Sequence, residues 1–176
     1  VSAVMQQFID AGYVVAGSCT PLARSTIGIA VRAGLPKPQI DSVEELTRYM
    51  LEAKSLAYSA SVSGKYLTTE IYPRLGITDV MMPKSHLATG GVRTGAVVAR
   101  GDAEVALAQI SELLPVKGLD YAGALPSEIQ MVTVFSGAVA AGAGEPQAAK
   151  ALLQFLASPL AAPAIVRSAM EPVKSP

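Results

Sequence analysis

Two patterns of apolar and polar residues alternate along the middle of the chain and predict its strands and helices. Between residues 25 and 111, short apolar runs alternate with longer segments in which apolar residues recur every three to four positions. Strands are expected at 25–33, 55–59, 80–82 and 104–110, and helices at 42–53, 63–75 and 91–100. Such alternation predicts an α/β fold with a mostly parallel sheet and helices on both faces.

The two ends of the chain follow a different order. Residues 1–11 have helical spacing, Gly12 stands where a left-handed residue ends a helix, and 13–16 reads as a short strand. From residue 119, two strands (119–122 and 130–140) precede two helices (146–157 and 160–169). This change of order predicts that the C-terminal segment returns to another lobe.

Local signals support several helix boundaries. Ser42 followed by Glu45 forms a capping box, and Pro146 stands at the favoured first position of a helix. Pro73 lies inside a predicted helix, and we expect it to shorten or kink that helix because it lacks a backbone N–H donor.

Composition excludes several classes of protein. Hydrophobic residues make up 51% and charged residues 16%, the opposite of a disordered chain. Basic and acidic residues number 14 each, and there is no Trp, so nothing attracts or stacks on nucleic acid. No apolar run reaches the roughly 18 residues of a membrane-spanning helix. Nucleic acid and membrane are therefore not expected partners.

Residues able to perform catalysis or to hold a metal are scarce. His86 is the only histidine and Cys19 the only cysteine, so neither a histidine-based metal cluster nor an intrachain disulfide can form. Dinucleotide, phosphate-loop and serine-hydrolase motifs are absent. The sequence therefore predicts no metal, no cofactor and no assigned catalytic residue, and His86 is interpreted as a solvated loop residue.

Two strand-to-helix turns are the better candidates for a site. Ser59–Lys65 and Thr89–Thr94 each place hydroxyl groups and glycine where a helix N-terminus would present N–H groups to an oxyanion. Both turns follow the carboxyl ends of strands, where open α/β sheets bind ligands. A purely structural role, with Ser63 as a helix cap, fits either turn taken alone. Arg93 is disfavoured at a helix start unless it has an anionic partner, and Gln109 ends the next strand.

The ordered set of short motifs resembles a known family. The motifs are IAVRAG at 29–34, PKP at 36–38, IDS at 40–42, AYS at 57–59, RLGI at 74–77, VARGDAE at 98–104, QISELLP at 109–115, GALP at 123–126 and FLASP at 155–159. Together they are similar to type II periplasmic solute-binding proteins of the molybdate-binding-protein-like group, which belong to ABC-type importers. The resemblance implies two α/β lobes, with residues 25–112 as the second lobe and 1–24 plus 113–176 as part of the first.

The resemblance also implies where a ligand binds. Second-lobe contacts carry over to Ser63, Gly64, Val92 and Gln109, and Arg93 is added from its position at the helix start. Molybdate receptors typically have Tyr where this chain has Gln109, which puts molybdate itself in doubt. About the first third of the family pattern has no counterpart here, so the first lobe would be incomplete.

Three functions remain open at this point. The leading hypothesis is a solute-binding protein for a small oxyanion or organic carboxylate, working with an ABC transporter permease. An isomerase of small carboxylates, related to aconitate isomerase, is the enzymatic alternative and would need His86 or Glu112 as a base. The third is a non-transport oligomeric relic. The incomplete lobe predicts a homo-oligomer or swapped dimer. A periplasmic location is expected if a signal peptide precedes Val1, and a cytoplasmic one otherwise.

Overall fold

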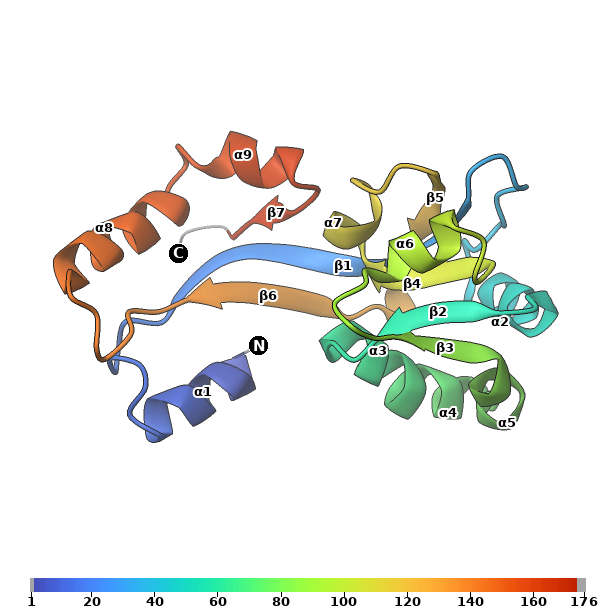
Figure 1. Ribbon diagram of the computed structural model, residues 1–176, viewed down its shortest axis with the longest axis horizontal. Coiled ribbons are helices and arrows are strands. Elements are labelled where there is room, and N and C mark those ends of the chain that lie inside the picture. Colours follow the sequence, from blue (N-terminus) through green and yellow to red (C-terminus); the bar gives the residue numbers. More distant parts are fainter. Residues whose placement is uncertain (1, 174–176) are drawn as a thin grey trace. The chain divides into compact units, whose positions relative to one another are not determined.

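The computed structural model describes residues 2–173 and divides into two compact units (Figure 1). Unit 1 consists of residues 1–25 and 132–176, and unit 2 of residues 26–131. The strand β1 (Thr20–Arg32) contributes its first residues to unit 1 and the remainder to unit 2.

The helices and strands of unit 2 alternate as the sequence predicts. The strands after β1 are β2 (Leu56–Ser59), β3 (Ser85–Ala88), β4 (Val105–Gln109) and β5 (Leu119–Ala124). The α-helices are α2 (Val43–Glu52), α3 (Val62–Tyr66), α4 (Tyr72–Leu75), α5 (Thr78–Met81), α6 (Thr94–Ala99) and α7 (Ile110–Leu113). A π-helix, η1 (Leu67–Ile71), joins α3 to α4, and two short 3-10 helices are η2 (Met82–Lys84) and η3 (Ser127–Ile129).

The sheet of unit 2 is mixed rather than mostly parallel. Its strand order is β3-β2-β4-β1-β5, and β2 is parallel to both β3 and β4. However, β1 pairs antiparallel with both β4 and β5. Strand–helix alternation predicts the parallel pairing of β2 with its neighbours, but the pattern carries no information on the direction of the strand that precedes them.

The two faces of this sheet carry side chains of different size. Ile27, Ile29, Leu56, Val105 and Leu107 share one core cluster with apolar residues of α2, η1 and α5. The alternate positions are alanines at 30, 57, 106 and 108, and these pack with Val98 of α6 and Leu113 of α7. Helices therefore cover both faces, as predicted (Figure 1).

The small alanine side chains allow α6 and its surroundings to pack closely. A Cβ atom on Gly95 of α6 would lie 2.8 Å from Leu119 Cδ1. Helix α6 is held against the sheet at short range, and this fixes the turn in front of it.

Pro73 affects the helix after β2 in an unexpected way. The helix neither stops nor shortens; it changes to a π-helix over Leu67–Ile71 and resumes as α4, with Pro73 in its first turn. The wider π turn accommodates a residue that has no N–H to donate. Tyr72 is consequently fully buried, and Gly76 ends α4 in the left-handed conformation with φ 67°.

The strand predicted at 80–82 is wrong. These residues form the end of α5 and the start of η2, and the strand β3 begins only at Ser85. Three apolar residues fit the end of a helix as well as a strand, so the local pattern does not distinguish the two. The helix expected at 91–100 begins later, at Thr94, and the capping box of α2 is confirmed: Ser42 Oγ accepts from Glu45 N at 3.1 Å.

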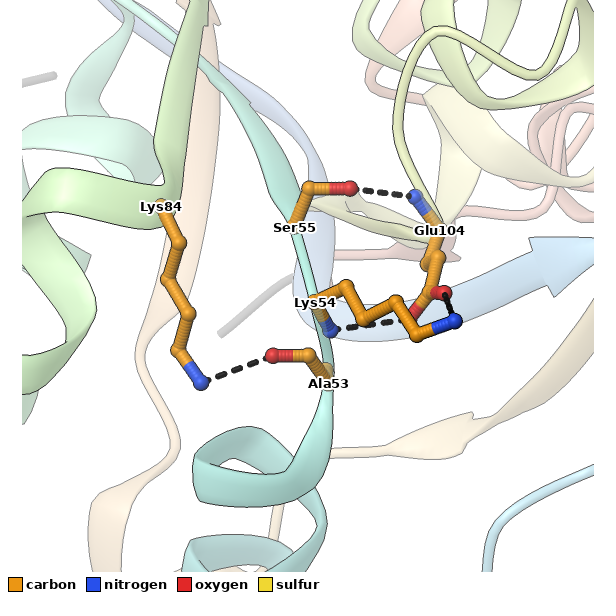
Figure 2. Close-up of polar contacts among 5 residues, drawn as sticks. All are labelled: Ala53, Lys54, Ser55, Lys84 and Glu104. Atoms are coloured by element: carbon orange, nitrogen blue, oxygen red, sulfur yellow. Dashed lines mark hydrogen bonds and ion pairs between the residues drawn. The ribbon is translucent and has the colours of Figure 1, made fainter.

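A polar network ties together the residues just before the three parallel strands (Figure 2). Lys84 Nζ donates to the carbonyl oxygens of Leu51 and Ala53, both at 2.7 Å, and so caps the C-terminal end of α2. Glu104 accepts from the backbone N of Lys54 at 2.9 Å, and its own N–H donates to Ser55 Oγ at 3.1 Å. The starts of β2 and β4 are thus fixed to each other, which leaves their opposite ends available for a site.

Unit 1 contains the chain termini and buries few large side chains. Its elements are α1 (Ser2–Asp10), β6 (Val132–Gly137), α8 (Pro146–Leu156), α9 (Ala162–Arg167) and β7 (Glu171–Pro172). Both β6 and β7 pair with β1, and the strand expected at 13–16 is a single bridge between Val14 and Ala140. Gly12 is left-handed, with φ 74°, as predicted. The predicted helix at 1–11 is observed at Ser2–Asp10, and Val1 lies outside the described residues.

The helices of unit 1 leave apolar side chains in solvent. Neither α8 nor α9 contains a buried residue. Leu152 is 56% exposed and Phe155 50% exposed on α8, and Leu160 before α9 is 79% exposed. None of the helices within residues 2–173 is long and apolar enough to cross a membrane.

The compact units and the predicted lobes agree on the first boundary along the chain but differ on the second. Both place the first boundary near residue 25, but unit 2 continues to Met131, whereas the predicted second lobe ends at residue 112. β5 and η3 pack with the sheet of unit 2, where Leu125 and Ile129 join its larger core cluster. The assignment of 25–112 as a receptor lobe stays a prediction.

Candidate functional site

The five predicted site residues all lie in unit 2, at or just after the ends of β2, β3 and β4. Because β2 is parallel to both of its neighbours, the three strands finish on the same side of the sheet. We call this side the carboxyl edge: Ser59 to Gly64 after β2, Thr89 to Thr94 after β3, and Gln109 to Glu112 at and after β4.

The turn after β2 carries a chain of three hydroxyl groups. Ser59 Oγ lies 2.7 Å from Ser61 Oγ, which lies 3.0 Å from Ser63 Oγ. Ser61 occupies the N-cap position of α3, so Ser63 is not the cap that a structural interpretation would make it. Ser63 is only 1% exposed and lies in the first turn of α3. The hydroxyl chain links a buried polar group to one nearer the surface.

Gly64 has a clear structural function at this turn. A Cβ atom built on Gly64 would lie 1.7 Å from the carbonyl oxygen of Ser59. Only glycine allows the start of α3 to approach the end of β2 this closely. The first turn of a helix has N–H groups without partners inside the helix, so the same close approach presents backbone donors at the carboxyl edge.

The turn after β3 is built on two left-handed glycines. Gly90 and Gly91 have φ of 65° and 75°, and Val92 N donates to Thr89 O at 3.2 Å. Arg93 is exposed and occupies the N-cap position of α6 with an extended backbone, so it precedes the helix rather than lying inside it. Its positive charge is nevertheless at the positive end of the helix dipole, the arrangement that favours an anionic partner.

Gln109 closes β4 at the carboxyl edge. The residue is 4% exposed, pairs in register with Ile27 of β1, and forms the N-cap position of α7. Ser111 lies in α7 rather than at the end of the strand. Both residues take part in interactions of their own.

Glu112 of α7 is electrostatically coupled to Arg93. Partial burial raises the pKa of the Glu112 carboxyl, and the positive charge of Arg93 lowers it by a smaller amount. The residue as a whole is exposed, so the loss of hydration concerns the carboxyl group and its immediate surroundings. A carboxylate with a raised pKa is a stronger base than an ordinary one, which is the property that proton removal requires.

The other candidate base has different surroundings. His86 is exposed in β3 beside Ala57, on an edge strand rather than in a loop. Residues 2–173 contain no group of three or more histidine, cysteine, aspartate or glutamate side chains able to hold a metal ion.

Thr94 belongs to the same edge and was not predicted. It is the first residue of α6 and is 3% exposed, and its Oγ1 atom is buried without a hydrogen-bond partner among the described residues. A threonine after an arginine at a helix start gives no sequence signal of burial. Helix α6 packs against β2, β4, β5 and α7, which lie at other places in the sequence.

Two hollows of the described structure lie away from this edge. A cavity of about 340 Å³ in unit 1 is lined by the loop at 15–20, Val139 and α8, with Lys150 at its rim. An open groove of about 700 Å³ follows α2 and α4. Neither of these two contains a predicted site residue.

Comparison with known proteins defines the class and then the family. Two solved structures share the fold. The periplasmic molybdate-binding protein of Azotobacter vinelandii superposes with a TM-score of 0.72 at 15% identity, over 99% of this chain and 76% of that one. The sulfate-binding protein of Mycobacterium tuberculosis gives 0.73 at 18% identity, over 99% of this chain and 67% of that one. The fold is therefore that of the periplasmic solute-binding proteins, as the sequence predicted.

Residues 1–171 match the family described as bacterial extracellular solute-binding protein, and the chain belongs to that family. A curated relative, the aconitate isomerase of a Pseudomonas species, is 39% identical over 173 residues. The match covers 98% of this chain and 66% of the length of that relative.

Proposed function

We propose that the chain binds a small anion at the carboxyl edge of unit 2, as a solute-binding protein of an ABC-type importer. The residues proposed to make the contacts are Ser63, Gly64, Val92, Arg93 and Gln109. The observation that carries the proposal is the hydroxyl chain from Ser59 to Ser63 on the same edge as Arg93. Hydroxyl groups, first-turn N–H groups and a guanidinium are all donors, and an anion is the ligand that accepts from all of them.

The names of the similar proteins support this choice of ligand. Two solved structures of the same fold are described as binding molybdate and sulfate, both of them oxyanions. The family membership supports transport as the purpose of binding, with a permease as partner and a periplasmic location. All three are proposals for this chain.

The relative at 39% identity favours one second candidate, an isomerase acting on a small carboxylate. Moving a double bond next to a carboxylate requires a group that removes a proton and returns it. Glu112 suits this role better than His86, because Glu112 lies on the carboxyl edge next to Arg93 and its pKa is raised by partial burial. Glu112→Gln with retained turnover of aconitate would exclude Glu112 as the base; His86→Ala provides the matched comparison.

We also propose that a second copy of the chain covers the apolar side chains of α8. The exposed Leu152 and Phe155 lie three positions apart on this helix and therefore share one face. Burial of such a face against another copy removes it from water, which favours association.

A thermal-unfolding screen tests the binding proposal directly. The chain is expected to unfold at a higher temperature with at least one of molybdate, sulfate, phosphate, citrate or aconitate. At a hundredfold excess over the dissociation constant, a bound ligand raises the free energy of unfolding by about 2.7 kcal/mol. Arg93→Gln should reduce the shift, whereas Arg48→Gln, at an exposed arginine of α2, should not. An unchanged midpoint with every anion would refute the proposal.

A further inference from the structure

We infer that Thr94 is a further ligand-binding residue of the carboxyl edge, whose hydroxyl group bonds to an oxygen of the bound anion. The inference rests on the proposed function and adds a residue that sets specificity.

Buried polar side chains gather at the carboxyl edge. Ser25, Ser63, Thr94, Gln109 and Thr133 are the buried polar residues of the described chain. Ser63, Thr94 and Gln109 belong to the edge, one beside each of the three turns. In a sheet whose faces are otherwise covered by aliphatic residues, polar groups at these places are costly unless they have partners.

Thr94 differs from the other two in its hydrogen bonding. Ser63 Oγ has Ser61 Oγ at 3.0 Å, and Gln109 has an interaction of its own. Thr94 Oγ1 is buried and has no partner among residues 2–173. Valine has the same shape and would fill the position without this penalty, so the packing of α6 does not account for a hydroxyl there.

The surroundings of Thr94 suit an anion oxygen as the partner. Arg93, immediately before Thr94, brings a positive charge that favours an anion at this place. A hydroxyl group can donate to an anionic oxygen, and it also can rotate to suit the ligand. Thr94 directly follows the turn that contains Gly90 and Gly91, so the residue stands at the start of α6, on the carboxyl edge. A ligand with several oxygens, such as a small di- or tricarboxylate or a tetrahedral oxyanion, could contact Arg93 and Thr94 together.

The test compares Thr94→Val with Thr94→Ser in the full chain. Unfolding midpoints are measured without anion and with citrate, aconitate, sulfate and molybdate. The dissociation constant of the anion that gives the largest shift is then measured by calorimetry. We expect Thr94→Val to unfold no lower than the wild type without anion and to bind at least about tenfold more weakly, since a hydrogen bond to a charged group is lost. Thr94→Ser, which keeps the hydroxyl, should bind within about threefold of the wild type.

Thr47→Val is the matched control. Thr47 lies on α2, and its hydroxyl donates to Val43 O at 2.6 Å, so the variant removes a partnered hydroxyl away from the carboxyl edge. Its affinity for the anion should equal that of the wild type.

Each other outcome overturns the inference in a recognisable way. Unchanged affinity in Thr94→Val shows that the hydroxyl does not contact the ligand. A lower midpoint of Thr94→Val without anion, restored by Thr94→Ser, shows that the hydroxyl serves the unliganded fold. If no anion raises the unfolding midpoint of the wild type, the proposed function fails and this inference fails with it. That result is obtained before any variant is compared.

Discussion

At the scale of single residues, Gly64 combines a structural and a proposed functional role. The sequence suggests a ligand contact, and the structure adds that a Cβ atom would lie 1.7 Å from Ser59 O. Backbone atoms on both sides of this contact cannot move aside as a flexible side chain would. The start of α3 can therefore stay close to β2 only if residue 64 has no side chain.

We predict that Gly64→Ala destabilises the fold by about 3 kcal/mol, because overpacking against backbone lies at the upper end of the usual range. Chemical denaturation measures the change in the free energy of unfolding. Gly144→Ala is the control, since its Cβ atom would meet nothing within 4 Å, and its effect should be close to zero. Equal stabilities of the two variants would show that the contact is relieved at little cost.

A second residue-scale prediction concerns the pKa of Glu112. Arg93 lowers this pKa against the larger effect of burial, so Arg93→Gln should raise it further. A carbon-13 NMR titration of the side-chain carboxyl measures it in both proteins. A lower or unchanged pKa in the variant would exclude the coupling.

The raised pKa of Glu112 also has a consequence for stability. The native state holds this proton more firmly than the unfolded chain does. The stabilising contribution of Glu112 is therefore complete below its unfolded-state pKa and is lost as pH rises through its native-state pKa.

The sequence predicted the location of the candidate site but not its hydrogen bonds. Strand ends, glycine and serine are visible as a pattern, so Ser63, Val92 and Gln109 fall on the carboxyl edge as expected. Thr94 is buried in a helix that packs against β2, β4, β5 and α7, elements distant from it in the sequence. The local pattern of residues does not show how closely two elements distant in the sequence pack together.

At the scale of elements, the helix cap made by Lys84 links the end of α2 to the start of β3. Lys84 stands just before β3, and its ammonium group donates to the carbonyl oxygens of Leu51 and Ala53 at the end of α2. Figure 2 shows the bond to Ala53. Lys54 offers a contrast, because its own ammonium group is 4.0 Å from Glu104 Oε1 and its side chain is 88% exposed.

Lys84→Met is expected to lower the free energy of unfolding by about 2 kcal/mol, since hydrogen bonds from a charged donor are lost at a helix C-terminus. Lys54→Met should cost less than about 1 kcal/mol, because a solvated ion pair contributes little. Denaturant titration of both variants gives the comparison. The reverse order of effects would contradict the role given to Lys84.

An element could be predicted from the sequence where apolar residues at a regular spacing follow a helix-capping residue. The helix α2 has both, and its start is observed where the sequence places it. The strand expected at 80–82 failed because three apolar residues fit a helix end as well as a strand.

At the scale of the whole molecule, the ordered motifs identified the fold more completely than any single pattern did. Composition excluded disorder and nucleic-acid binding, and alternation indicated an α/β sheet. The mixed direction of the strands and the compact unit ending at Met131 depend on long-range pairing of β1 with β5. Periodicity alone does not determine such pairing.

The exposed face of α8 leads to a prediction for the whole molecule. The wild type should sediment as a dimer at micromolar concentration, and Leu152→Glu should weaken association by roughly tenfold or more, because a buried leucine contributes about 1.5–3 kcal/mol. Leu51→Glu replaces another exposed leucine, on α2, and should leave association unchanged. A compact wild-type monomer in the same experiment would refute the dimer.

The π-helix between α3 and α4 also absorbs one residue while the two α-helices on either side of it stay in rotational phase. Each residue of an α-helix turns the chain by about 100°, whereas a π turn holds one residue more. That extra residue brings Tyr72 to the buried face directly after Ile71, where its hydroxyl lies 2.7 Å from Ser85 Oγ. Removing one residue within 67–71 would give a regular helix and still keep both of its ends in phase. The same deletion within α2 would turn Met50 away from the core.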